Sequence, residues 1–228
     1  YGLGLLEAVP DATLNALTDP TDKNGDGISG RRIKVGDLYG RFGWKADHPD
    51  LRNFVIDAFL TELGIAPYDP DKNPYSSMDL NQMSVAADYV RTIEAPPVHP
   101  NLEQFKRGEI VFNEIGCGTC HTPELKTAAA VFPELANKTI RPYTDMLLHH
   151  LGQGDLHSNP EKALPEEFRT PPLWGIGAIG GPYMNDNSAP DLTTAIEKHG
   201  GEASAVREKF RKLADEDKKH LLDFLNHL

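Results

Sequence analysis

Apolar side chains recur at helical spacing in two segments of the first hundred residues. One series lies between Asp50 and Gly64, and a second runs from residue 80 to residue 93. Because residues three and four apart share one face of an α-helix, both series predict amphipathic helices. Asp50 is a typical helix cap, Gly64 is a typical helix end, and the Pro96-Pro97 pair stops the second helix. We therefore place a domain boundary after residue 95.

Three further helices are predicted beyond this boundary. Asn101 and Gln104 match a capping box at the start of a helix that runs to Ile115. Residues 191–199 form a short apolar stretch of helical character, and Asp215 is predicted to cap the last helix. The chain is thus expected to be mainly helical on both sides of the boundary.

Five residues just after the predicted helix end at Ile115 carry the clearest chemical signal. They are Cys117-Gly118-Thr119-Cys120-His121, and a Cys-x-x-Cys-His series is the attachment motif of a c-type haem. A thioredoxin-like dithiol would need a preceding strand and does not account for His121, and a zinc site would need a second pair of cysteines. We therefore expect one covalent haem c, attached through Cys117 and Cys120, with His121 as the proximal iron ligand.

The stretch after this motif has a different character. Residues 122–190 contain many Pro and Gly residues and no long periodic series, as expected where a haem replaces part of the core and loops wrap around it. We therefore predict an all-α fold of cytochrome c-like domains with long haem-wrapping loops. The predicted helical stretch at 79–93 resembles the last one in length and apolar pattern, which suggests two related halves, the first without its own haem motif.

Composition and charge narrow the class of partner. The 228 residues include 39% hydrophobic residues, enough for a buried core, and the net charge is −11. Nucleic acid is excluded as a partner because phosphate binding relies on Lys and Arg, whereas a basic or neutral redox protein fits this charge. No run of about eighteen apolar residues occurs, so no membrane-spanning helix is expected. The first residues lack the charged start of a signal peptide, so this end looks processed or cut.

Oxygen-bearing side chains alternate in the loop from Asp22 to Ile28. Asp22, Asn24 and Asp26 stand at positions one, three and five, and a glycine follows at position six, as in the first half of an EF-hand loop. Position twelve is Ile33 rather than a bidentate Glu, so the Ile28 carbonyl, water or a distant acid would have to complete the site. We expect either a calcium site or a solvated turn of Asp, Asn and Gly.

Several short motifs follow one another along the chain in a specific order. They are Gly2 to Ala8, Asp26 to Gly30, Gly40 to Ala46, Cys117 to Lys126, Pro142 to Asp145, Arg169 to Gly175, Pro182-Tyr183 and His199-Gly200. In this order and spacing the chain resembles the C-terminal part of di-haem cytochrome c peroxidase relatives, in the branch called di-haem or thiol oxidoreductases. Such proteins resemble two fused cytochrome c domains, with a peroxidatic haem in the first and an electron-transfer haem in the second.

The resemblance implies how the two halves correspond to this family. Its first haem motif normally precedes the segment that is Gly2 to Ala8 here, so residue 1 would lie inside the first domain. Residues 1–95 are then expected to be the remainder of a first cytochrome c-like domain that lacks its haem motif. Residues 96–228 are expected to be the cytochrome c domain with the covalent haem.

A six-coordinate iron needs a second ligand opposite His121. The candidates are His149, His150, His157, Met184 and His199. In the peroxidase relatives this ligand lies late in the helix after the Pro-Tyr segment, one residue before a glycine, which implies His199 here. Met184 and the His149/His150 pair remain the alternatives. Two histidine ligands give a lower potential than histidine with methionine, so a low-potential carrier without an open position for peroxide is expected.

The resemblance also implies roles for residues away from the motif. Trp44 could relay electrons between two haems, and Glu62 falls near the position where relatives place an acid over the peroxidatic iron, to move a proton between the peroxide oxygens. A core tryptophan and a solvated helical glutamate are the alternatives. A backbone carbonyl at Pro171 or Pro172 is a candidate acceptor for the Nδ1–H group of His121.

The function expected from the motif and the resemblance is electron transfer. The chain would be the c-type haem part of a di-haem oxidoreductase or peroxidase-like protein, and would exchange electrons with a redox partner protein or an upstream haem domain. Enzymatic activity would belong to the full-length form. A stand-alone mono-haem electron carrier is the alternative, and a haem sensor with a ligand replacing His199 is a third hypothesis. Because covalent haem attachment takes place outside the cytoplasmic membrane, we expect a periplasmic protein.

Overall fold

The computed structural model describes residues 1–76, 78–97, 103–130, 132–152, 154 and 162–228. Its α-helices are α1 (Leu3–Glu7), α2 (Asp11–Ala16), α3 (Leu51–Leu63), α4 (Leu80–Thr92), α5 (Glu103–Ile115), α6 (Ile176–Ile179), α7 (Leu192–Glu197), α8 (Ser204–Lys212) and α9 (Asp215–Asn226). Short 3-10 helices are η1 (Cys117–Thr119), η2 (Pro133–Leu135) and η3 (Gly201–Ala203). The chain is therefore rich in helix, as predicted.

Within the described residues, six strands of two or three residues add a component that an all-α fold would lack. They are β1 (Lys34–Val35), β2 (Leu38–Tyr39), β3 (Leu125–Lys126), β4 (Thr139–Ile140), β5 (Leu148–His150) and β6 (Glu167–Arg169). They pair in order as three antiparallel two-stranded sheets. In the β5–β6 pair, His149 lies opposite Phe168 and His150 lies opposite Glu167. These sheets tie together the irregular segments between the helices.

Local sequence signals explain where two of the predicted helices begin and end. The Asp50 side chain accepts the Asn53 N–H at the start of α3, which ends at Gly64 with a φ of 68°, a conformation that glycine adopts without strain. At the start of α4, Asp79 and Gln82 form a reciprocal capping box. The predicted cap at Asn101 lies outside the described residues. Asp215 is the first residue of α9 and not its cap, which is Ala214.

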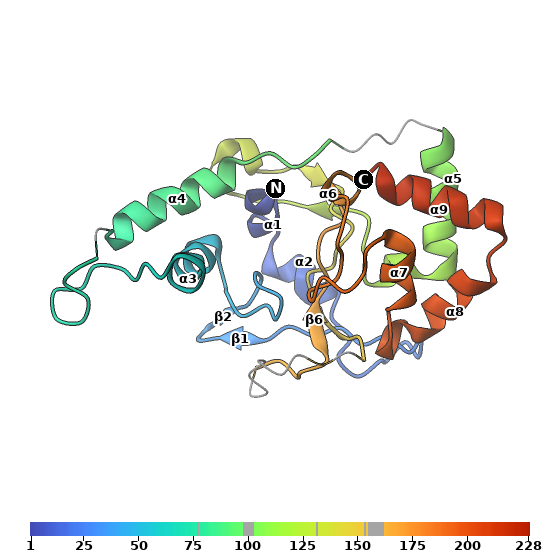
Figure 1. The fold of residues 1–228 in the computed structure, drawn as a ribbon, viewed down its shortest axis with the longest axis horizontal. Coiled ribbons are helices and arrows are strands. Elements are labelled where there is room, and N and C mark those ends of the chain that lie inside the picture. Colours follow the sequence, from blue (N-terminus) through green and yellow to red (C-terminus); the bar gives the residue numbers. More distant parts are fainter. Residues whose placement is uncertain (77, 98–102, 131, 153, 155–161) are drawn as a thin grey trace.

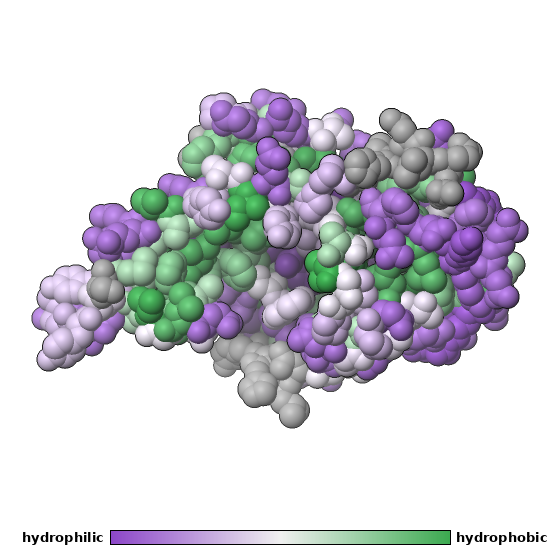
Figure 2. Space-filling view, turned by 45° about the horizontal axis from the view of Figure 1, so that its top comes forward, coloured by the Kyte–Doolittle hydropathy of each residue, from purple (hydrophilic) through white to green (hydrophobic). Residues whose placement is uncertain are grey.

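Figure 1 shows the helices in two groups, with α3 and α4 at one end of the molecule and α5, α7, α8 and α9 at the other. Strand β6 and both chain ends lie between the two groups, and β1 and β2 lie near α3. On the first group, Leu60, Leu63, Val85 and Tyr89 are exposed, and Figure 2 shows apolar residues gathered on that side and polar ones at the opposite end.

Within the described residues, no helix combines the length and apolar character that crossing a membrane requires.

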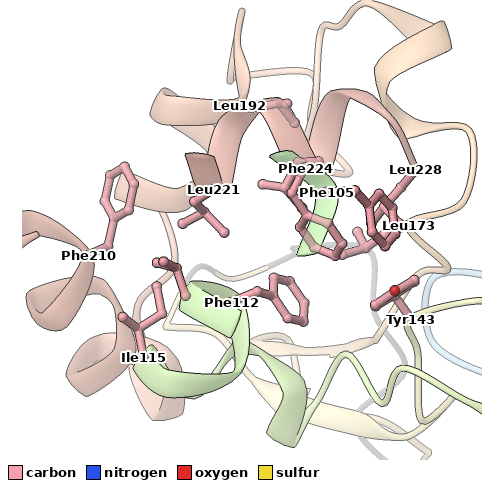
Figure 3. Packing of buried hydrophobic residues seen from close by; sticks show 12 residues of the cluster. Phe105, Phe112, Ile115, Tyr143, Leu173, Leu192, Phe210, Leu221, Phe224 and Leu228 are labelled. Carbon is pink, nitrogen blue, oxygen red and sulfur yellow. The ribbon is translucent and has the colours of Figure 1, made fainter. Parts of the chain in front are cut away.

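The main core forms where α5 crosses α9. Phe105 and Phe112 of α5 meet Phe224 of α9 edge to face, at ring-centroid distances of 4.8 and 5.4 Å, and Figure 3 shows this packing. Gly108 makes the close crossing possible, because a Cβ there would collide with the His220 carbonyl and Phe224 Cβ. This crossing fixes the end of α5, from which the haem motif continues.

A second core joins the N-terminal segment to later parts of the chain. Leu6, Phe42 and Leu51 share one buried cluster with Met146 and Trp174, together with Val9, Leu14, Leu125 and Ile140. Residues from both sides of position 95 therefore pack together. The domain boundary after residue 95 stays a prediction.

Candidate functional site

The haem motif begins where α5 ends. Gly116 has a φ of 102° and leads into η1, which carries Cys117 to Thr119, and the His121 N–H donates to the Cys117 carbonyl over 3.0 Å. Both cysteines are free, half-buried thiols, and burial raises the pKa of Cys117 to about 12. Two thiols and an imidazole are thus held on one short turn, which is the donor set that a covalent haem requires.

A segment after Arg141 runs beside this turn and is bonded to it three times. The Thr144 N–H donates to the Thr122 carbonyl and the Asp145 N–H donates to the Cys120 carbonyl, each over 3.0 Å. In the opposite direction, His121 Nδ1 lies 3.0 Å from the Tyr143 carbonyl. A carbonyl can only accept, so Nδ1 carries the proton and Nε2 keeps its lone pair. The acceptor is therefore Tyr143, and neither Pro171 nor Pro172 as proposed from sequence.

Tyr143 is held at both its backbone and its ring. Its φ of 53° lies in the left-handed region, which is unfavourable for an aromatic residue. The ring is fully buried and meets Phe112 and Phe224 edge to face, as Figure 3 shows. Its hydroxyl donates to Glu109 over 2.9 Å and accepts from Arg141 over 2.7 Å. Core packing thus holds the carbonyl that orients His121.

His199 follows α7 and has the same hydrogen-bonding pattern as His121. Its Nδ1 lies 2.7 Å from the Ala195 carbonyl, so here too Nε2 keeps the lone pair. Burial lowers the pKa of His199. Burial also lowers the pKa of His121 to about 4, and the second largest cause is electrostatic repulsion from His199. The two half-buried imidazoles are therefore close enough to interact, and both are neutral at pH 7.

The alternative iron ligands are placed differently. His149 is only 4% exposed, with Nε2 2.8 Å from Asp145 Oδ2 and Nδ1 3.3 Å from Glu202 Oε2. Neither ring nitrogen is left free for a metal. His150 and Met184 are half-buried, and His157 lies outside the described residues.

His149, Asp145 and Glu202 form a buried charged cluster that sequence reasoning did not identify. Two of the motifs behind the family resemblance, Pro142 to Asp145 and His199-Gly200, adjoin this cluster. Nothing in them indicated that His149 and Glu202 would be in contact. The available signal was the position of two acidic residues in the sequence. Asp145 lies two residues after Tyr143, whose carbonyl binds His121, and Glu202 lies three residues after His199. Burial alone would lower the pKa of His149, but hydrogen bonds to Asp145, Cys120 and Glu202 outweigh it and raise the pKa to about 12.

Trp44 and Glu62 are both at the surface. The Trp44 side chain is 57% exposed, while its backbone carbonyl accepts the Arg169 N–H over 2.8 Å. Its neighbour Lys45 donates to the Glu167 carbonyl over 2.7 Å, so this segment is fixed against β6. Glu62 is exposed near the end of α3. The structure therefore does not join either side chain to the haem motif.

The candidate calcium loop is closed by its own side chains. Asp22 Oδ2 accepts the Gly27 N–H, Asn24 Oδ1 accepts the Asp26 N–H, and Asp26 Oδ1 accepts the Ile28 N–H. These contacts match the solvated turn. Asp22 Oδ1 is different, because it is buried without a hydrogen-bond partner in the described structure. Among the described residues, no group of three or more His, Cys, Asp or Glu side chains is arranged to hold a metal ion.

A family model described as "Di-haem oxidoreductase, putative peroxidase" matches residues 1–92 and 88–228. No curated protein matches the chain.

Two of the solved structures that are similar to this chain illustrate the likeness. One is a MauG-like protein associated with microbial copper homeostasis, with 18% identity over 100% of this chain and 86% of that one, at a TM-score of 0.52. The other is hydrazine synthase from Kuenenia stuttgartiensis, with 20% identity over 64% of this chain and 55% of that one, at a TM-score of 0.41. The present chain thus spans about half the length of the matched hydrazine synthase chain. The MauG-like structure shows that the fold is shared.

Proposed function

Because this chain belongs to the di-haem oxidoreductase family, we propose that it is the haem c electron-transfer part of a peroxidase-like oxidoreductase. Cys117 and Cys120 would attach one haem covalently, and His121 and His199 would bind its iron from opposite faces. Electrons would pass between a redox partner protein or a second haem domain and this site. Covalent attachment of haem takes place outside the cytoplasmic membrane, which supports a periplasmic location.

One observation supports this proposal above the others. His121 and His199 each donate Nδ1–H to a backbone carbonyl, of Tyr143 and of Ala195. A histidine that binds a metal through Nε2 commonly makes this second hydrogen bond, which fixes the tautomer and the ring orientation. Two neutral imidazoles prepared in this way, beside two thiols, suit a six-coordinate haem.

The protein groups then determine what the site can do. A bound haem supplies a one-electron couple between ferric and ferrous iron. His121 and His199 remain neutral at pH 7 because burial lowers the pKa of each, so both lone pairs are available. The carbonyls of Tyr143 and Ala195 make the rings more basic, which favours the ferric state. If both imidazoles bound the iron, no position would be left for peroxide, so these residues would favour electron transfer.

The visible spectrum of the oxidised protein tests this ligand assignment. Two imidazole ligands should give a low-spin spectrum without the red charge-transfer band that reports a bond between methionine sulfur and iron. The same preparation should show one haem per chain by pyridine haemochrome analysis. A methionine–iron band would identify Met184, in place of His199, as the second iron ligand. A high-spin ferric spectrum would contradict the six-coordinate site.

A stand-alone mono-haem electron carrier is the second candidate function. The single Cys-x-x-Cys-His motif in the 228 residues favours it. In a two-haem protein, Trp44 would be proposed as an electron relay and Glu62 as the acid near the peroxidatic iron. Their exposure is compatible with a further domain that covers them. A second haem motif in the precursor would favour the two-haem protein over the stand-alone carrier.

We also propose that the loop from Asp22 to Ile28 binds calcium. The buried, unpartnered Asp22 Oδ1 supports an oxygen ligand that lacks its cation, and Asn24, Asp26 and the Ile28 carbonyl would supply others. Binding would require the side-chain turns of this loop to open. The solvated turn is the alternative.

Removal of calcium is expected to lower the melting temperature of the wild-type protein by about 5–10 °C. This follows from a linkage free energy of about 2.7 kcal/mol at a calcium concentration 100 times Kd. Asp26→Ala should abolish the effect of the chelator. Asp69→Ala is the matched control, because Asp69 Oδ1 accepts two backbone N–H groups in a similar exposed turn. Equal melting temperatures with and without chelator in the wild type would leave only the solvated turn.

A further inference from the structure

The buried cluster around His149 joins the haem motif to three other segments of the chain. Asp145 comes from the segment that orients His121, and Glu202 follows the distal candidate His199 by three residues. Cys120 Sγ lies 3.6 Å from His149 Nδ1. The Ser29 hydroxyl, from the N-terminal half, donates to Glu202 Oε1 over 2.7 Å.

The hydrogen bonds define the charge of each member. His149 faces a carboxylate oxygen with each ring nitrogen, so both nitrogens must donate and the ring is an imidazolium. Asp145 Oδ1 accepts the Leu147 N–H over 2.9 Å. Glu202 accepts the Ser29 N–H over 3.0 Å and the His150 N–H over 3.3 Å. These backbone donors keep both carboxylates ionised when His149 is replaced.

The surroundings of the cluster exclude most of the solvent. The side chains of His149 and Asp145 are 4% and 3% exposed, and Gly30 leaves no room between its backbone and the His149 ring. Half-buried Arg169 is within electrostatic range of Asp145. A charge in such a place acts at an effective dielectric constant of about 20 rather than 80, so salt does not screen it as it would at the surface.

We propose that His149 is a positioning residue whose buried positive charge, balanced by Asp145 and Glu202, sets the reduction potential of the haem attached to Cys120. This inference rests on the proposed function, since it requires the haem. An imidazolium beside the attached sulfur opposes the extra positive charge of ferric iron and so favours the ferrous state. The nearest carboxylates act in the opposite direction. The cluster carries a net charge of −1, from one imidazolium and two carboxylates.

Two variants shift this charge in opposite directions. His149→Gln changes the net charge of the cluster from −1 to −2, and Glu202→Gln changes it from −1 to 0. The double variant returns it to −1. His227→Gln is the matched control, because His227 is exposed just after the end of α9 and its side chain donates to the Asp223 carbonyl.

The experiment is a spectroscopic redox titration of the haem-loaded proteins at pH 8. His149→Gln should lower the ratio of reduced to oxidised protein at the wild-type midpoint about tenfold, a shift of about 59 mV for one electron. Glu202→Gln should raise this ratio, and the double variant and His227→Gln should stay near the wild type. If His149→Gln does not fold, the increase in the ratio of reduced to oxidised protein in Glu202→Gln is by itself the test of the proposal.

Shifts of the same sign in both single variants, or changes below twofold, would overturn the proposal and leave the cluster with a packing role. Haem bound covalently in such a protein would leave the proposed function intact. A wild-type protein without covalent haem would overturn both.

Discussion

Replacement of His199 by alanine is expected to open one face of the haem iron. The ferrous variant should bind carbon monoxide, which the wild-type protein should not do. The variant should stay folded, because His199 follows the end of α7 and its loss removes one neutral hydrogen bond to Ala195, worth about 1 kcal/mol. The visible spectrum of the reduced protein under carbon monoxide measures this outcome directly.

The same variant links ligation to peroxide chemistry. Peroxide reduction needs an exchangeable position on iron, so His199→Ala should react with hydrogen peroxide faster than the wild type does. The wild-type chain should turn over far below about 10 per second, an ordinary enzymatic rate. His150→Ala and Met184→Ala are the controls, since either residue would give carbon monoxide binding in place of His199 if it were the true ligand. Wild-type turnover at or above that rate would contradict the closed site.

Loss of both cysteines is expected to convert the covalent haem into an extractable one. In Cys117→Ala/Cys120→Ala, acid-acetone should remove all haem, whereas the wild-type chain should retain it and show the mass of one added haem after denaturation. Each single variant keeps one thiol, so each should retain haem through one thioether bond. These single variants also control for the loss of a half-buried side chain. Extraction of haem from the wild type would refute covalent attachment.

The parts of this molecule that local sequence encodes were predictable. The helix between Asp50 and Gly64 has its cap, its apolar face and its stop within the fifteen residues from 50 to 64, and α3 appears as predicted. The start of α9 shows the limit of this reasoning. Asp215 has the chemistry of a cap, but Ala214 takes the extended conformation at that position, and Asp215 instead places its charge in the first turn, where the helix dipole favours it.

The environment of the site depends on contacts between distant residues, so the sequence did not reveal it. The Tyr143 carbonyl reaches His121 only because the segment after Arg141 pairs with the haem motif. His149 had the chemistry of an iron ligand, but Glu202, 53 residues later, takes up one of its nitrogens. A histidine in a sequence cannot be identified as a ligand until the partners of both its nitrogens are known.

The left-handed bend from Tyr143 to Met146 has a consequence for motion at the site. Tyr143 and Met146 have φ values of 53° and 59° without being glycine, and each costs about 1–3 kcal/mol. This strain gives the bend a tendency to open that the bonds to Cys120, His121 and Thr122 must resist. Because all of these bonds come from one short segment, we expect them to break together when the bend opens. Each opening would free the His121 ring to rotate. Because Asp145 belongs to the same bend, it would also release His149. The lifetime of the closed bend would then limit how long both rings stay aligned.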